Sequence, residues 1–121
     1  MKILDNKHWA MENFQDCELG DKRRTTRLVK MANGMVDAPE KSLPGQFTQW
    51  ACLKAAYRFF DTPQVTLDGI CTPHWKQTRD AKPGRYLLIS DTTEMDFTGH
   101  IATEGLGMLG NGKGRGFQLH P

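Results

Sequence analysis

The sequence has few cysteines, no long hydrophobic run and little net charge. Its 121 residues include three cysteines, and an odd number at wide spacings excludes a disulfide framework and is typical of reduced thiols. No apolar run approaches the roughly 18 residues of a membrane span. Residues 1–9 lack the apolar core of a signal peptide. We therefore expect a cytoplasmic protein with no membrane partner.

Complete catalytic and metal-binding motifs are also scarce. Cys71 and His74 have a Cys-x-x-His spacing, but a zinc site needs about four ligands, and no second Cys/His pair is nearby. Residues 105–114 are similar to a dinucleotide loop and to a phosphate loop, yet they do not lie between a predicted strand and a helix. No nucleophile–base pair is apparent, which disfavours an enzyme acting on small molecules.

The net charge of +2 conceals a concentrated basic segment. Residues 22–30 contain no acid and five cations, which are Lys22, Arg23, Arg24, Arg27 and Lys30. Asp21 is placed to cap the start of a helix, and the apolar residues between 28 and 35 follow the spacing of a buried stripe. Because lysine and arginine neutralise DNA phosphates, this segment predicts a DNA-binding helix. The alternative is an ordinary solvated helix face.

Most of the first eighty residues is expected to be helical, on both sides of a loop over residues 37–45 that two prolines and a glycine indicate. The predicted segments are a short amphipathic stretch over 1–14, the basic helix ending at Gly34, a helix over 46–60, and a helix over 66–79 that Thr66 caps and Pro73 breaks or kinks. Lys54 and Arg58 share one face of the helix over 46–60. They extend the predicted DNA-binding surface if the helices pack side by side.

After residue 80 the pattern changes to strands. Four bulky residues at 86–89 predict a strand over 85–90 that is covered on both faces. Asp91 follows at the tip of this strand, where enzymes often place metal ligands or acid/base groups. The alternative is that Asp91 only caps a turn. Glu94 and Asp96 are the nearest other carboxylates, and the chain shows no obvious complete set of metal ligands.

Two further strands are predicted over residues 95–100 and 116–120. The glycine-rich residues between them are expected to be mobile. Lys113 and Arg115 in this loop either follow a DNA backbone or belong to a flexible hairpin connection.

Four short motifs, taken in order, resemble a known family. They are LGDKRRTTRL at 19–28, AAYRFF at 55–60, ISDTT at 89–93, and the ending G-R-G-F-x-x-H. Together they resemble the N-terminal part of bacterial insertion-sequence transposases of the insertion-sequence-four family. The resemblance covers nearly the whole chain.

The resemblance implies an α+β chain with two parts. Residues 1–80 would form a helical domain that binds double-stranded DNA at transposon ends, with Arg23, Arg24 and Arg27 on its basic helix. Residues 81–121 would supply the first antiparallel strands of a truncated ribonuclease-H-like catalytic domain. Asp91 matches the first member of an Asp-Asp-Glu (DDE) triad that holds Mg²⁺ or Mn²⁺.

The second Asp and the Glu of that triad are expected beyond residue 121. The resemblance therefore implies no strand transfer and no tight metal binding by this chain alone. It also implies nucleoid association and a dimer with full-length transposase. Two alternatives stay open, which are a non-catalytic DNA-binding module that inhibits transposition and a non-functional gene remnant.

Overall fold

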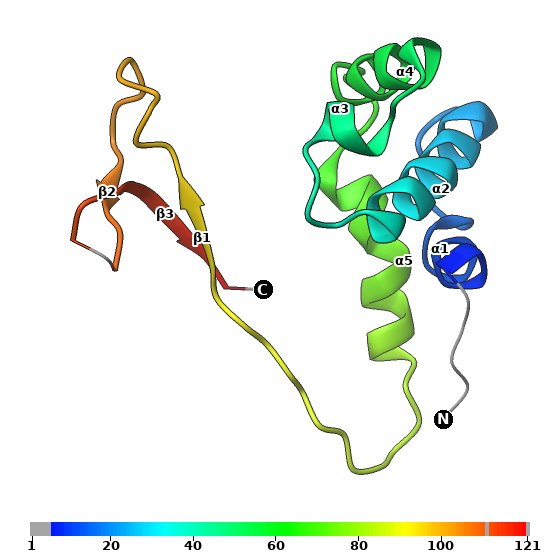
Figure 1. Cartoon of the computed structure of the whole chain (residues 1–121). Helices are drawn as coiled ribbons and strands as arrows, with labels where there is room; N and C mark the ends of the chain where they lie inside the picture. The colour runs from blue at the N-terminus through cyan, green and yellow to red at the C-terminus, as the bar shows by residue number, and fades with distance from the viewer. Residues whose placement is uncertain (1–5, 111, 121) are drawn as a thin grey trace. The chain divides into compact units, whose positions relative to one another are not determined.

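A set of helices is followed along the chain by a small antiparallel sheet (Figure 1). The computed structural model describes residues 6–110 and 112–120. The chain divides into two units, one up to Lys82 and one from Pro83. The helices are α1 (Asn6–Phe14), α2 (Lys22–Asp37), α3 (Leu43–Gln46), α4 (Trp50–Phe60) and α5 (Leu67–Arg79). Across the described residues, no helix combines the length and the apolar character that a membrane crossing requires.

Helix α2 is central to the first unit. It begins where the sequence predicts, because Oδ1 of Asp21 accepts a hydrogen bond from the backbone N–H of Arg23 at 2.8 Å. Leu28, Met31 and Ala32 are buried along it, which confirms the predicted apolar stripe. It packs against α1, α3 and α4. The core of the unit consists of Cys17, Leu19, Leu28, Met31, Ala56 and Phe59.

The predicted end of the basic helix at Gly34 is wrong, because α2 continues to Asp37. Gly34 instead allows a close approach between elements. A Cβ atom at this position would lie 2.7 Å from Cε1 of Phe47, a separation that real Cβ contacts do not reach. The glycine therefore makes room for the aromatic ring and does not terminate the helix.

The helix predicted over 46–60 begins only at Trp50, as α4, because residues 47–49 are not helical. Helix α3 forms instead at the end of the segment predicted as a loop. Pro44 stands in the first turn of α3, where a proline is tolerated. The predicted break at Pro73 is also absent, since α5 runs through it. The predicted cap of α5 is confirmed, because Oγ1 of Thr66 accepts a hydrogen bond from the N–H of Gly69 at 3.1 Å.

The second unit contains β1 (Thr93–Asp96), β2 (Gly107–Met108) and β3 (Arg115–Leu119). They form an antiparallel sheet in the order β1-β3-β2, with Met95 opposite Phe117. The rings of Phe97 and Phe117 stack with their centroids 5.6 Å apart. A Cβ at Gly116 would collide with the carbonyl oxygen of Met95, so the pairing of β1 with β3 requires glycine there.

The predicted buried strand over residues 85–90 is wrong. These residues form no strand, and Leu87, Leu88 and Ile89 are 84, 90 and 85% exposed. In the described sheet, no strand pairs with this segment, so no strand ladder protects it. The strand predicted over 95–100 ends at Asp96, and the glycine-rich loop contains β2. The identity of this sheet as the start of a ribonuclease-H-like domain stays a prediction.

Candidate nucleic-acid interface

Helices α2 and α4 bring four arginines together around one surface depression, called here the arginine hollow. It has a volume of about 300 Å³. The first turns of α2 form one side and the last turns of α4 form the other. The arginines are Arg23, Arg24, Arg27 and Arg58, and the remaining lining residues are Asp21, Ala55, Phe59 and Thr62. Residues far apart in the sequence thus form one cationic surface.

Arg23 is exposed and is paired with the cap of its own helix. Its side chain is 91% exposed, and its Nη2 lies 2.8 Å from Oδ2 of Asp21. Its Nε also donates to the same carboxylate at 3.2 Å. The hydrogen bonds from Arg23 lower the pKa of Asp21 to about 2. The carboxylate therefore stays ionised at neutral pH and offsets part of the charge of Arg23.

Arg24 is anchored to the loop that precedes α2. Its Nη1 donates a hydrogen bond to the carbonyl oxygen of Leu19 at 2.7 Å. Gly20, between them, has a φ of 75°, a left-handed conformation that favours glycine. A Cβ there would lie 3.1 Å from Nη1 of Arg24. Arg24 thus holds the entry to α2 and contributes its charge from a fixed position.

Arg27 and Arg58 are the two arginines of the hollow whose side chains make no hydrogen bond in the described structure. In the part of the chain that the structure describes, neither guanidinium makes a side-chain hydrogen bond or an ion pair. Arg27 is half-buried and Arg58 is exposed. A guanidinium offers five N–H donors in a planar fork that matches a phosphate. These two residues are the best-placed phosphate ligands of the hollow.

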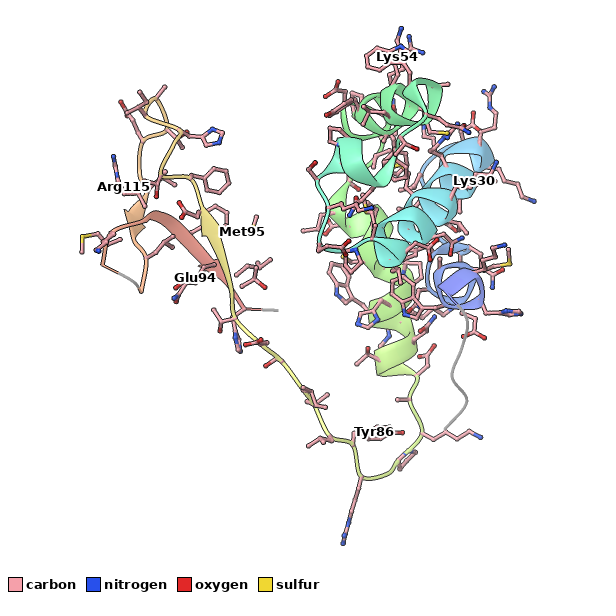
Figure 2. All side chains as sticks on the ribbon, viewed as in Figure 1. Lys30, Lys54, Tyr86, Glu94, Met95 and Arg115 are labelled. Carbon is pink, nitrogen blue, oxygen red and sulfur yellow. The ribbon has the colours of Figure 1, made fainter. Side chains whose placement is uncertain are left out.

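The predicted lysines lie outside the arginine hollow. Lys22 and Lys30 line a different groove of about 370 Å³ between α1 and α2, together with Lys7. Lys54 is exposed on α4, outside both depressions. Figure 2 shows Lys30 and Lys54 pointing outward from their helices. The predicted single basic stripe is therefore divided over two sides of α2. Sequence periodicity missed this division because the position of α4 decides it.

The remaining predicted site residues belong to the second unit. Lys113 and Arg115 are exposed, and Arg115 starts β3. Asp91 is exposed and precedes β1 by two residues, so it does not stand at the end of a buried strand as predicted. Its Oδ1 accepts a hydrogen bond from the N–H of Thr92 at 2.8 Å.

His120 lies beside the segment that carries Asp91, and clustering of carboxylates in the sequence did not indicate it. Its Nδ1 lies 2.8 Å from Oγ1 of Thr92, and its Nε2 lies 3.3 Å from Oγ of Ser90. The imidazole thus contacts the residues on both sides of Asp91. The G-R-G-F-x-x-H ending could have indicated this neighbour. The antiparallel pairing of β1 with β3 places its histidine beside the residues that precede β1.

The other two predicted carboxylates, Glu94 and Asp96, accept hydrogen bonds from backbone N–H groups of the second unit. Oε1 of Glu94 accepts from the N–H of Gly110 at 3.2 Å, and Oδ1 of Asp96 accepts from the N–H of Thr98 at 2.8 Å. The bonds from Thr98 lower the pKa of Asp96. Among the described residues, no three His, Cys, Asp or Glu side chains gather around a common point where a metal would bind.

A capped basic helix packed beside a second basic helix is characteristic of small helical DNA-binding domains. The family comparison agrees with this class, because residues 6–65 match the model of the family described as Transposase DNA-binding. The match includes α1 to α4, and therefore the whole arginine hollow. Residues 6–65 are therefore similar to a transposase DNA-binding domain, and this similarity suggests DNA as the partner. Helix α5 and the sheet lie outside the match.

Proposed function

We propose that the helical unit binds duplex DNA at a transposon end and lays the arginine hollow against the phosphate backbone. The observation that carries this proposal is the convergence of four guanidinium groups from α2 and α4 on one surface. Phosphate contacts release condensed counterions, which makes binding strong at low salt and weak at high salt. Arg27 and Arg58 supply contacts of this kind. Lys22, Lys30 and Lys54 add charge around them.

The proposal extends to the rest of the protein's activity. The chain would be the N-terminal part of a DDE transposase of the insertion-sequence-four family, able to dimerise with full-length transposase. Asp91 would be one carboxylate of a Mg²⁺ or Mn²⁺ site completed by residues outside this sequence. The order of the four sequence motifs supports this part. We expect no specific nicking when the chain is incubated with transposon-end DNA and magnesium, and site-specific nicks would contradict it.

Replacing both Arg27 and Arg58 with alanine tests the DNA-binding surface. Each lost phosphate contact should lower the slope of log affinity against log salt by about 0.9. We therefore expect the double variant to bind a mixed-sequence duplex roughly tenfold more weakly at low salt, with a slope smaller by about 2. Fluorescence anisotropy over a series of salt concentrations measures both quantities.

A matched control is the double variant Lys76→Ala and Arg79→Ala. It removes two exposed cations from the last turn of α5, away from the hollow, and changes the net charge equally. If the control weakens binding as much as Arg27→Ala with Arg58→Ala does, the hollow has no special role. Circular dichroism should show the same helicity for both variants.

A further inference from the structure

The outer face of α4 carries exposed aromatic rings beside a cation. We call Trp50, Lys54 and Tyr57 the aromatic stripe. Trp50 is 71% exposed and Tyr57 is 46% exposed, and Lys54 between them is exposed as well. Their spacing of four and three residues places them on one face of the helix. Trp50 and Tyr57 lie about 10 Å apart along its axis.

The stripe is not part of the hydrophobic core. Helix α4 contributes Ala56 and Phe59 to the core cluster, and these two residues lie on a different face. Within the described residues, neither Trp50 nor Tyr57 stacks on another aromatic ring. Large aromatic side chains exposed at regular spacing lose the burial that normally stabilises them. Such a surface is typical of a binding site.

The stripe adjoins the arginine hollow. At about 100° per residue, Arg58 lies between the stripe and the face of α4 that lines the hollow. Residues 50–60 include two cations and no acid. Asp61 follows the helix, and Asp21, which pairs with Arg23, lines the hollow. The two cations on α4 itself are complementary to a polyanion.

We propose that the aromatic stripe binds an unpaired DNA strand that continues from the duplex held at the arginine hollow. Bases stack on exposed aromatic rings whatever their sequence, while nearby cations neutralise the phosphates. Trp50 and Tyr57 supply two stacking surfaces, and Lys54 and Arg58 supply the charges. This inference rests on the proposed duplex binding and specifies the form of DNA that the site prefers.

A second copy of the chain fits this face less well than DNA does. A two-fold symmetric contact brings the same patch of two copies together. Lys54 and Arg58 of one copy would then approach their equivalents in the other. Repulsion between those cations disfavours such a contact. DNA meets the same cations with negative charge.

Two DNA probes separate strand binding from duplex binding. One is a blunt mixed-sequence duplex, and the other is the same duplex with a single-stranded pyrimidine extension. We expect the full chain to bind the extended duplex about tenfold more tightly than the blunt one. In the variant Trp50→Ala with Tyr57→Ala, we expect this ratio to fall to about one, while affinity for the blunt duplex stays unchanged. Fluorescence anisotropy with each probe measures the ratio.

Trp75→Ala is the matched control, because Trp75 is 50% exposed on α5 and should leave the preference intact. Three results would overturn the proposal. The first is a wild-type chain that does not prefer the extended duplex. The second is a stripe variant that keeps this preference. The third is a stripe variant whose affinity falls as much for the blunt duplex as for the extended one. Sedimentation showing that the stripe variant turns a dimer into a monomer would assign the face to a second copy instead. Arg27→Ala with Arg58→Ala on the blunt duplex tests the duplex proposal separately.

Discussion

Asp21 both caps α2 and pairs with Arg23, so its carboxylate bears on stability and on DNA binding at once. Asparagine caps a helix about as well as aspartate but carries no charge to hold Arg23. We predict that Asp21→Asn keeps the melting temperature within a few degrees of wild type and binds duplex DNA several-fold more tightly at low salt. Thermal melting and fluorescence anisotropy on the same sample check both outcomes. Unchanged or weaker DNA binding would mean that Arg23 does not reach the phosphates.

The ion pair of Asp21 also predicts a dependence of stability on pH. Folding lowers the pKa of this carboxyl from 3.8 to about 2. A group with a lowered folded pKa stabilises the native state above its unfolded pKa and loses that contribution as the pH falls through the folded value. The difference in melting temperature between wild type and Asp21→Asn should therefore be constant above about pH 4 and decrease between pH 4 and 2. A constant difference down to pH 2 would show that Asp21 is not paired.

At the scale of single residues, the sequence predicted the cations but not their partners. Five cations and no acid between residues 22 and 30 are visible without a structure. The sequence does not show that these cations separate into two groups. Arg27 lines the hollow with α4, while Lys30 lines the groove between α1 and α2. Arg24 bonds to the carbonyl oxygen of Leu19, a contact that depends on the turn at Gly20. The packing of the helices therefore decides which groups each cation contacts.

At the scale of elements, Gly34 shows how packing overrides local propensity. Alanine is a better helix former than glycine by about 1 kcal/mol, so an isolated helix would gain from Gly34→Ala. In the folded chain the new Cβ would lie 2.7 Å from the ring of Phe47, and overpacking costs about 1–3 kcal/mol. We predict that Gly34→Ala lowers the free energy of unfolding by about 1 kcal/mol. Urea denaturation followed by circular dichroism measures the change.

A second background makes the Gly34 prediction sharper. In a Phe47→Leu chain the ring edge is gone, so Gly34→Ala should become neutral or stabilising. The difference between the two backgrounds is the interaction energy of the pair. If alanine is stabilising already beside the native Phe47, the close approach of α2 and Phe47 is wrong.

Helices were predicted better than strands. The caps at Asp21 and Thr66 and the apolar stripe of α2 depend on nearby residues, and the structure confirms all three. The segment over 85–90 has strong strand propensity, yet that propensity reflects how side chains fit a covered, pleated surface. The described sheet places no neighbouring strand beside it. A strand needs a partner that its own sequence does not contain.

At the scale of the whole molecule, the arginine hollow and the aromatic stripe both belong to the helical unit. All residues of these two surfaces lie between Asp21 and Thr62. Lys113 and Arg115 are in the second unit, and their predicted contact with DNA is independent of the hollow. The exposed apolar residues 86–89 lie near the start of the second unit, which begins at Pro83. This arrangement lets the two contributions be measured separately.

Limited digestion with chymotrypsin should separate the units, because the protease cuts after aromatic residues and leucine and Tyr86, Leu87 and Leu88 are 63, 84 and 90% exposed. We predict early cleavage there and a helical fragment that keeps its circular dichroism spectrum and most of its duplex affinity. If Lys113 and Arg115 contact phosphates, the salt slope of the fragment is smaller than that of the intact chain by at most about 2. The intact variant Lys113→Ala with Arg115→Ala should then match the fragment. Loss of all binding on cleavage would show that the hollow is not sufficient, since the cut leaves its arginines untouched.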